Sequence, residues 1–314
     1  MNVLVIGAAG FVGGYLIDEF FRCGYDVTAT KLSNEVIHST HCKVVDLDIL
    51  VENDIRDVVK KSRPDAIVHL AAQSSVALSW ENPALTARVN IIGAVNLLEA
   101  LNKLGYKNKV LLIGSGEEYG RVSESDNPID ENAPAHPANI YAATKTCQNM
   151  LGQIYSDAYE LNIVMVRAFN HVGPGQSPTF VVSDFCKQVA EIEAGIREPV
   201  IYTGNLTAMR DFTDVRDVVR AYAALIKKGK KGSIYNVGSG KSIEISKILE
   251  MVVNASTADI KTAVDKSRFR PIDVPVIEAD ISKIKAETGW KPEIDLTVTI
   301  AETLDYWRRN IGGA

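Results

Sequence analysis

A glycine run directly after the first apolar stretch constrains the fold more than any other feature of the chain. Residues 2–6 resemble a buried strand, and Gly7, Gly10 and Gly13 follow at the spacing G-x-x-G-x-x-G. Gly7 allows a tight turn, Gly10 lets the backbone approach a pyrophosphate, and Gly13 permits close packing of a helix on the strand. A helix that begins here directs the positive end of its dipole at the anion. This context predicts a dinucleotide-binding loop, whose expected contacts are Gly7, Gly10, Phe11, Val12 and Gly13.

Strand-like and helix-like segments alternate over the first half of the chain. Short apolar runs typical of buried parallel strands lie at 3–6, 27–30, 43–45, 66–70, 110–113 and 163–166. Amphipathic patterns predict helices at 11–22, 52–61, 83–104 and 141–160. Such alternation predicts an α/β fold, a Rossmann-type doubly wound parallel sheet over residues 1–168. The looser pattern beyond predicts a smaller, discontinuous α/β substrate lobe over 169–314, from which a segment near 212–238 returns to the sheet.

Composition excludes several classes of function. The 314 residues, 46% of them hydrophobic, suffice for one large core and a smaller lobe. A net charge of -5 argues against a nucleic-acid or anionic-membrane partner. We expect no signal peptide and no apolar run long enough to span a bilayer, and hence a cytoplasmic protein. Four cysteines without C-x-x-C spacing predict free thiols and no metal site: Cys23, Cys42, Cys147 and Cys186.

Three residues point to acid/base chemistry. Tyr141 and Lys145 lie four residues apart on a predicted helix and therefore share one face. A positive charge beside a phenol lowers the pKa of that phenol, so this pair is expected to work near neutral pH. Ser115, at the end of the predicted strand, supplies a third polar group that can orient a carbonyl or hydroxyl oxygen. Together they predict hydride transfer to or from a carbon that bears oxygen.

The end of the second predicted strand bears on the choice of dinucleotide. Many dinucleotide folds place an acid there to hold the ribose 2'-hydroxyl, whereas this chain has Thr30 and Lys31. Lys31 would tolerate a 2'-phosphate. We therefore expect NADP(H) to be preferred, with NAD(H) as the alternative if Lys31 is merely a solvated loop residue.

These features resemble the extended short-chain dehydrogenase/reductase family over essentially the whole chain. The motifs are the glycine loop, 46–49, 69–73, Ser115 and Tyr141-x3-Lys145. The resemblance implies that Asp48 and Ile49 contact the adenine, and that Leu70, Ala71 and Ala72 line the nicotinamide-ribose side. It also implies that Lys145 bridges the ribose hydroxyls, and that Tyr141 protonates the substrate oxygen while Ser115 holds it.

Further motifs narrow the resemblance within the family. The segments 114–120, 169–176, 210–217, 270–275 and 289–292 are similar to enzymes that reduce the 4-keto group of GDP-4-dehydro-6-deoxy-D-mannose to GDP-D-rhamnose. A GDP-sugar is thus the implied substrate. Guanidinium groups bind a diphosphate better than ammonium groups do, which favours Arg210 and Arg270 as contacts. The expected substrate-binding residues are Ser115, Asn170, Lys187, Arg210, Arg270 and Asp273.

Glu117, a further catalytic candidate, keeps alternatives open. GDP-mannose 4,6-dehydratases use a carboxylate two residues after the catalytic hydroxyl, but the reductases carry one there too. Residues 172–176 lack the acidic and arginine-rich character of the dehydratases, and Gly116 stands where the reductases usually have serine. Another sugar-nucleotide dehydratase or epimerase therefore remains an alternative. A non-catalytic dinucleotide sensor is a more remote one, because it would not need the acid/base pair.

The predicted helices 83–104 and 141–160 carry apolar residues on more than one face. On the first, these are Ala87, Ile91, Ala94, Val95 and Leu98. Apolar residues on two faces need two packing partners. We therefore expect a homodimer formed through a four-helix bundle, which the family resemblance also implies.

Overall fold

The computed structural model describes residues 1–269, residue 272 and residues 274–312. Within these residues, seven parallel strands form the main sheet, in the order β10-β6-β5-β4-β1-β2-β3. Their bounds are β1 (Asn2–Ile6), β2 (Asp26–Lys31), β3 (Lys43–Asp46), β4 (Ala66–His69), β5 (Lys109–Ser115), β6 (Ile163–Ala168) and β10 (Ile234–Val237). The Rossmann-type doubly wound fold is thereby confirmed. The strand order reverses between β1 and β4, the place where such sheets bind ligands.

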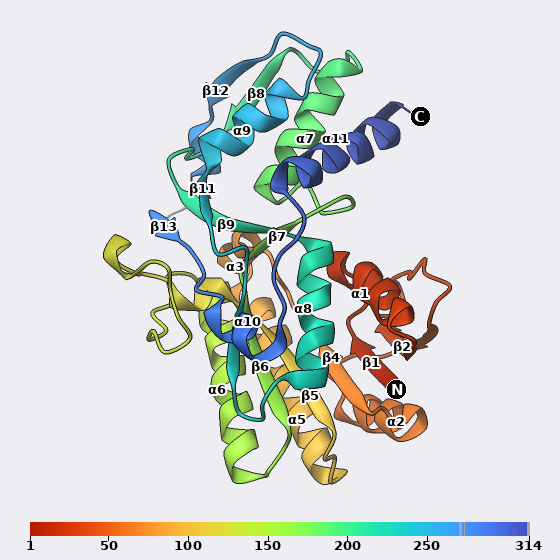
Figure 1. Ribbon diagram of the computed structural model, residues 1–314. Coiled ribbons are helices and arrows are strands. Elements are labelled where there is room, and N and C mark those ends of the chain that lie inside the picture. The colour runs from red at the N-terminus through yellow and green to blue at the C-terminus, as the bar shows by residue number, and fades with distance from the viewer. Residues whose placement is uncertain (270–271, 273, 313–314) are drawn as a thin grey trace.

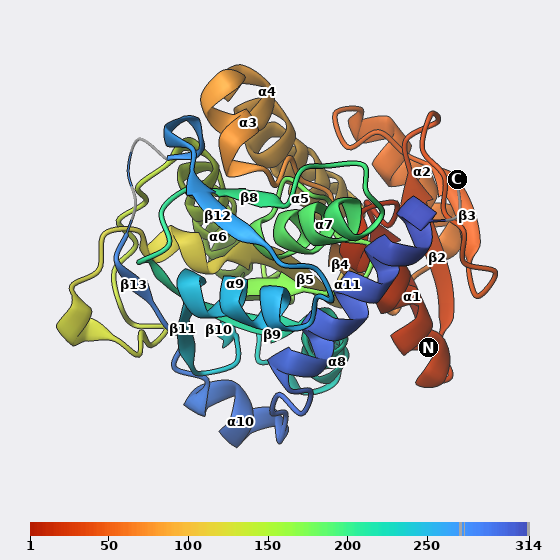
Figure 2. The same cartoon turned by 90° about the horizontal axis from the view of Figure 1, so that it is seen from above.

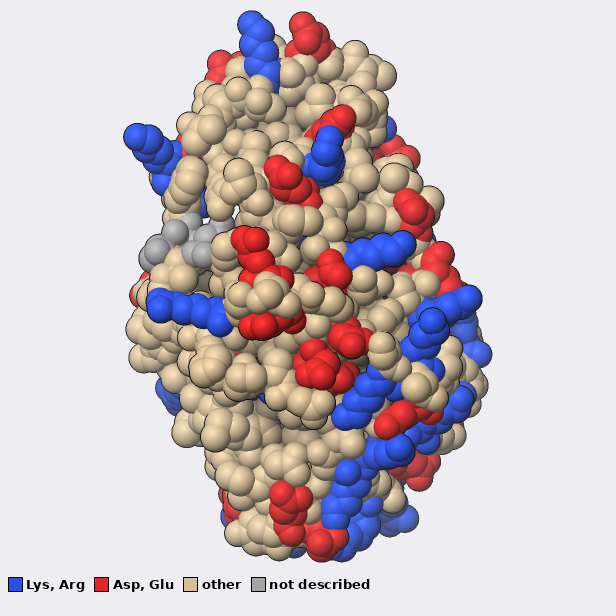
Figure 3. Space-filling view, turned by 60° about the vertical axis from the view of Figure 1, so that its left-hand side comes forward, with Lys and Arg blue, Asp and Glu red and all other residues tan. Residues whose placement is uncertain are grey.

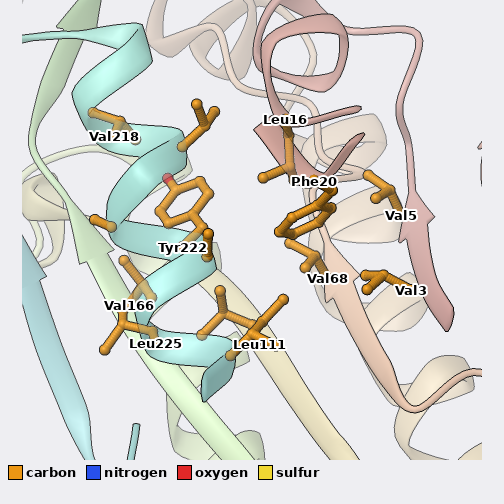
Figure 4. Close-up of a cluster of buried hydrophobic side chains, with 14 of the residues drawn as sticks. Val3, Val5, Leu16, Phe20, Val68, Leu111, Val166, Val218, Tyr222 and Leu225 are labelled. Atoms are coloured by element: carbon orange, nitrogen blue, oxygen red, sulfur yellow. The ribbon is translucent and has the colours of Figure 1, made fainter. Parts of the chain in front are cut away.

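Alternate residues of each strand enter the two cores on opposite faces of this sheet. Val3 and Val5 of β1 pack with Phe20 on one face, whereas Leu4 and Ile6 belong to the core on the other. Figure 4 shows the first core, where side chains of α1 (Phe11–Arg22) and α8 (Val215–Lys228) lie over the strands. The second core is covered by α2 (Glu52–Ser62), α5 (Gly93–Lys103) and α6 (Ile140–Ala158). Because both faces are covered, β4 and β6 are buried along their whole length, whereas the edge strand β3 is largely exposed.

The helix expected over 83–104 is interrupted. It consists of α4 (Pro83–Ala87), a π-helical turn η1 (Arg88–Ile92) and α5, and a short helix α3 (Val76–Glu81) precedes it. Contrary to our expectation, Pro83–Lys103 is long and apolar enough to cross a bilayer by length and composition alone. Its neighbours in the fold are α2 and α6, and 44% of its most apolar window is buried inside the protein. The apolar residues therefore have a role in the core of the protein, and their composition is weak evidence for a membrane span.

The second lobe lies above the main sheet in Figure 1 and is seen from above in Figure 2. Its central strand β9 (Met209–Asp214) pairs with β7 (Asn170–Val172), β11 (Ser242–Glu244) and β13 (Val276–Ile277), while β8 (Val200–Thr203) pairs with β12 (Lys261–Val264). The helices are α7 (Val181–Glu193), α9 (Ile245–Asn254) and α11 (Leu296–Gly312), and their apolar faces share one core.

The chain passes between the lobes more than once. After β9, α8 and β10 return to the main sheet, and α10 (Ser282–Thr288) contacts both of them. Short 3-10 turns complete the fold: η2 (Gly116–Tyr119), η3 (Glu124–Asp126) and η4 (Lys266–Arg268). On the face shown in Figure 3, acidic and basic side chains both occur, and neither sign covers the face.

Candidate active site

A cavity of about 1220 Å³ is lined by residues of both lobes. The first lobe contributes the loop after β1, the segments after β3 and β4, the end of β5 and the start of α6. The second lobe contributes the N-terminal turns of α7, the segment 204–208, Arg210 and the turn η4 with Phe269. The site therefore lies outside the carboxyl ends of the parallel strands, across the point where their order reverses.

The glycine loop fits a dinucleotide diphosphate. Gly7 has a φ of +80°, and a Cβ there would lie 2.5 Å from the Cα of Ala71. A Cβ on Gly13 would lie 2.0 Å from the carbonyl oxygen of Ala8. A Cβ on Gly10 would meet only the carbonyl oxygen of Gly7, at an ordinary contact distance of 3.8 Å, and no side chain caps the N-terminus of α1. The first N–H groups of this helix are therefore available to an anion at the cavity wall.

All the expected dinucleotide contacts line the cavity: Gly7, Gly10, Phe11, Val12, Gly13, Lys31, Asp48, Ile49, Leu70, Ala71, Ala72, Tyr141 and Lys145.

Lys31 forms an ion pair that the sequence analysis did not foresee. The register of β2 and β3 pairs Lys31 with Asp46, and the ammonium lies 2.7 Å from that carboxylate. Asp46 does not itself line the cavity, so it affects the site through its ion pair with Lys31. Glu35 also lines the cavity and was missed, because it lies in a loop rather than at a strand end.

Ser115, Tyr141 and Lys145 meet at the cavity wall. Ser115 ends β5, and Asn139 caps α6 by accepting a hydrogen bond from the backbone of Ala142, so Tyr141 lies in the first turn. The Tyr141 hydroxyl forms a hydrogen bond with Ser115. Lys145 is buried and donates to Oε1 of Gln148 at 2.9 Å. The three groups predicted from the sequence are therefore brought together.

The pKa values of Tyr141 and Lys145 differ from the expectation. Burial raises the pKa of Tyr141 above its ordinary value, the hydrogen bond with Ser115 opposes this, and the charges of Glu118 and Glu117 add to it. Burial lowers the pKa of Lys145 to about 8. The expectation that Lys145 tunes the phenol toward neutrality is wrong, since burial raises the pKa of Tyr141 more than its hydrogen-bonding partner lowers it. The phenol is consequently held in its protonated form.

Asn90 does not line the cavity, but it supports segments that do, and sequence reasoning missed it. It lies in the π-helical turn, is fully buried, and donates to Oγ1 of Thr144 at 2.9 Å and to the carbonyl of Gln73 at 3.0 Å. Its Oδ1 accepts from the backbone N–H of Gln73 at 2.8 Å. Asn90 therefore links the cavity segment after β4 to the helix turn that carries Lys145. A polar residue within an apolar helical run was the available signal.

Two acids follow Ser115, and they have different surroundings. Glu118 is fully buried and accepts from the Ser115 backbone N–H at 2.8 Å, from Asn149 at 2.8 Å and from Arg167 at 3.2 Å. Glu118 thus fixes the backbone at Ser115. Glu117 lines the cavity, where its Oε2 accepts from Asn139 at 3.0 Å.

The candidates for substrate binding divide into three groups. Asn170 and Arg210 line the cavity, and Nη1 of Arg210 donates to the carbonyl of Val274 at 2.6 Å. Lys187 does not line it, because α7 turns this side chain toward Glu191, 3.5 Å away, and toward the ring of Trp307. The structure thus does not bring Lys187 to the site. Arg270 and Asp273 lie outside the described residues.

Gly116, the departure from the reductase pattern, has a steric reason. A Cβ at this position would lie 2.9 Å from Cγ of Phe169. Both residues border a small hollow beside the cavity, together with Ser115 and Asn170. The aromatic ring therefore occupies the space that a serine side chain would need.

A doubly wound sheet with this glycine loop and this serine, tyrosine and lysine defines the class of extended short-chain dehydrogenase/reductases. Residues 4–303 match the family described as GDP-mannose 4,6 dehydratase. The GDP-6-deoxy-D-mannose reductase of Pseudomonas aeruginosa is 32% identical over 310 residues, covering 99% of this chain and 98% of that protein.

Two solved structures extend the comparison. RMD from Pseudomonas aeruginosa complexed with NADPH is 30% identical, with a TM-score of 0.85 and coverage of 98% of this chain and 99% of that chain. The UDP-glucose 4-epimerase of Thermus thermophilus in complex with NAD is 29% identical, with a TM-score of 0.87 and the same coverage. The chain therefore belongs to the extended short-chain dehydrogenase/reductase family, as an NAD(P)-dependent enzyme that acts on nucleotide sugars.

Proposed function

We propose that this enzyme reduces the 4-keto group of GDP-4-dehydro-6-deoxy-D-mannose to GDP-D-rhamnose, with NADPH preferred over NADH. The observation that carries the proposal is that the Tyr141 phenol, Ser115 and Lys145 meet at the wall of one cavity beside the glycine loop. A ketone reductase needs an acid at that place, because the oxygen gains a proton as the carbon gains hydride. The reductase of Pseudomonas aeruginosa, similar over nearly the whole chain, supports this substrate.

The roles of the residues follow from their positions. NADPH, when bound, supplies the hydride. Tyr141 donates its proton to the C4 oxygen, Ser115 holds that oxygen, and Lys145 binds the nicotinamide ribose hydroxyls. Asn170 contacts the sugar, Arg210 and Arg270 bind the diphosphate, and Asp273 is a further substrate contact. The glycine loop holds the dinucleotide diphosphate through backbone N–H groups, which leaves the cavity side chains for the substrate.

Turnover of the keto sugar tests the proposal. The purified protein is mixed with GDP-4-dehydro-6-deoxy-D-mannose and NADPH, the nicotinamide absorbance is followed, and the product is identified by NMR. We expect consumption of about one NADPH per product, since each hydride reduces one ketone. An unchanged absorbance with substrate present would contradict the assignment. A product with the talo configuration at C4 would preserve the reductase but correct its stereochemistry.

Glu117 supports a second candidate, a GDP-mannose 4,6-dehydratase, which is also how the matching family is described. A dehydratase must remove a proton from C5 and protonate the leaving hydroxyl at C6, and a carboxylate beside Ser115 could do both. Ketone reduction has no such step. We therefore expect Glu117→Gln to keep substantial reductase activity, and the wild-type protein to leave GDP-mannose unchanged without added reductant. Loss of water from GDP-mannose, read by mass spectrometry, would favour the dehydratase.

The proposed assembly is a homodimer in the cytoplasm. Three apolar side chains on η1 and α6 are exposed by 49% or more: Ile92 at 49%, Met150 at 61% and Ile154 at 54%. Met150 and Ile154 lie one helical turn apart, so they share a face that a second copy can cover through a four-helix bundle. Light scattering should give twice the chain mass, and Met150→Glu with Ile154→Glu should give the mass of one chain.

A further inference from the structure

A carboxylate stands in the part of the cavity formed by the second lobe. Asp184, in the first turn of α7, lines the cavity with its side chain 19% exposed. Nη1 of Arg268 lies 2.6 Å from its Oδ2, and Nε2 of Gln188 donates to the same oxygen at 2.7 Å. Arg268 and Phe269 line the cavity beside it. None of the roles proposed above uses this carboxylate.

The position of Asp184 is fixed by the backbone of β8. Gln188, which is buried, accepts from the N–H of Tyr202 at 3.0 Å and donates to the carbonyl of Tyr202 at 3.3 Å. The Gln188 side chain that donates to Asp184 is therefore fixed by the backbone of Tyr202. A carboxylate supported in this way loses little conformational freedom when it binds a ligand.

One oxygen of the Asp184 carboxylate, Oδ1, can accept further hydrogen bonds. A carboxylate offers about four acceptor positions, and both bonds described above go to Oδ2. Among the described residues, no donor reaches Oδ1. Oδ1 of the ionised carboxylate can only accept hydrogen bonds, so the ligand group that meets it must present N–H or O–H donors, which a diphosphate does not.

The nucleobases differ in the donors that they present. Guanine carries two adjacent donors on one edge, N1–H and the 2-amino group. Uracil and thymine carry a single N3–H between two carbonyl oxygens, and those oxygens would face the carboxylate unfavourably. Hydrogen-bonding sites reject analogues that leave a buried group unpaired, or that oppose it with a like group.

We propose that Asp184 is a specificity-determining residue that selects a guanine nucleotide by accepting hydrogen bonds from N1–H and the 2-amino group, with Phe269 against the base. This inference rests on the proposed function, since it assumes that the cavity holds a nucleotide sugar. It goes beyond that function by assigning the base subsite and naming the residue that reads the base.

Binding of free nucleoside diphosphates tests the proposal without turnover. Calorimetry with GDP, IDP and UDP separates the donors, because IDP lacks only the 2-amino group. We expect the wild-type protein to bind GDP on the order of tenfold more tightly than IDP, the effect of one hydrogen bond to a charged group, and more tightly still than UDP. Asp184→Asn, which keeps the size of the side chain, should bring the GDP to IDP ratio to within about threefold.

The matched control is Glu191→Gln on the same helix. Glu191 pairs with Lys187 and Arg197 and does not line the cavity, so removal of its charge should leave the GDP to IDP ratio at the wild-type value. Equal wild-type affinity for GDP and IDP would overturn the proposal. A variant Asp184→Asn that weakens GDP-mannose but leaves GDP unchanged would also overturn it, and would assign Asp184 to the sugar.

The two proposals fail separately. If the enzyme proves to be a dehydratase, guanine selectivity in this binding assay still stands, because no chemical step is measured. If the reductase is active but GDP and IDP bind equally, the reaction stands and the base subsite is wrong.

Discussion

The two walls of the cavity present different kinds of groups to a ligand. In the first lobe the main binding groups belong to the backbone, namely Gly7, Gly10 and Gly13 with the uncapped start of α1. In the second lobe they are charged side chains, and the pair Arg268 and Asp184 joins residues 84 positions apart. A backbone site is encoded in one short segment, whereas a side-chain site depends on distant segments meeting. For this reason the cofactor half of such an enzyme is evident in a motif and the substrate half is not.

Tyr141→Phe removes the phenol hydroxyl that is proposed to act on the substrate beside the cofactor. Of the variants considered, it should have the largest effect on activity. We expect kcat to fall by about 10² to 10⁴, the range for loss of one acid/base group, because the phenol acts on the substrate oxygen in the transition state. Dinucleotide affinity should stay nearly unchanged. Steady-state kinetics with a parallel fluorescence titration of NADPH measures both quantities. Retention of most of kcat would show that another group donates the proton.

Lys145→Met tests how much the buried charge of Lys145 lowers the free energy of unfolding when no cofactor is added. Burial lowers the pKa of Lys145 from its ordinary value of 10.5 to about 8, so the folded state disfavours the proton. The penalty is present in full below about pH 8 and is relieved as pH rises toward 10.5. The variant should therefore gain stability relative to wild type, on the order of 3 kcal/mol at pH 7 and progressively less up to pH ~10.

Urea unfolding of both proteins between pH 7 and 10 measures this difference. The same variant should lose turnover and bind the dinucleotide more weakly, because the ammonium is assigned to the ribose hydroxyls. A stability difference that does not vary with pH would show that the pKa of Lys145 is the same in the folded and the unfolded protein.

Arg210→Ala should weaken substrate binding and leave cofactor binding unchanged. The guanidinium lines the cavity and is 7% exposed, and a charge-assisted contact with a diphosphate is worth ~1.5 to 3 kcal/mol. We expect KM for the nucleotide sugar to rise by about ten- to a hundredfold, while KM for NADPH stays the same. The bond from Arg210 to Val274 also predicts some loss of stability, so the melting temperature is measured alongside. An unchanged KM would limit Arg210 to that structural bond.

Gly13→Ala should weaken cofactor binding and leave substrate binding unchanged. The new Cβ would lie 2.0 Å from the carbonyl oxygen of Ala8, and overpacking of this kind costs about 1 to 3 kcal/mol. Gly14→Ala is the matched control, since a Cβ there meets nothing within 4 Å. We expect NADPH affinity to fall in the first variant and to remain in the second. Equal behaviour of the two variants would contradict the close approach of α1 to β1.

Lys31→Asp should have the smallest effect, a several-fold shift of preference from NADPH toward NADH. The effect is limited because Asp46 already holds the ammonium at 2.7 Å and competes with a 2'-phosphate. By the same reasoning, Asp46→Asn should raise the preference for NADPH. KM for both cofactors in the three proteins is the measurement. An unchanged ratio in both variants would place Lys31 away from the ribose.

The sequence by itself determined the sheet, the glycine loop and the serine, tyrosine and lysine at its edge. These features follow from local periodicity and backbone geometry, which a short segment encodes. Other features were decided only by the tertiary structure. They include the partner of Lys31 on β3, the distance of Lys187 from the cavity, the π-helical turn that places Asn90, and the protonated state of Tyr141. Each of them depends on burial or on contacts between segments far apart in the chain, and neither is written in the spacing of residues along it.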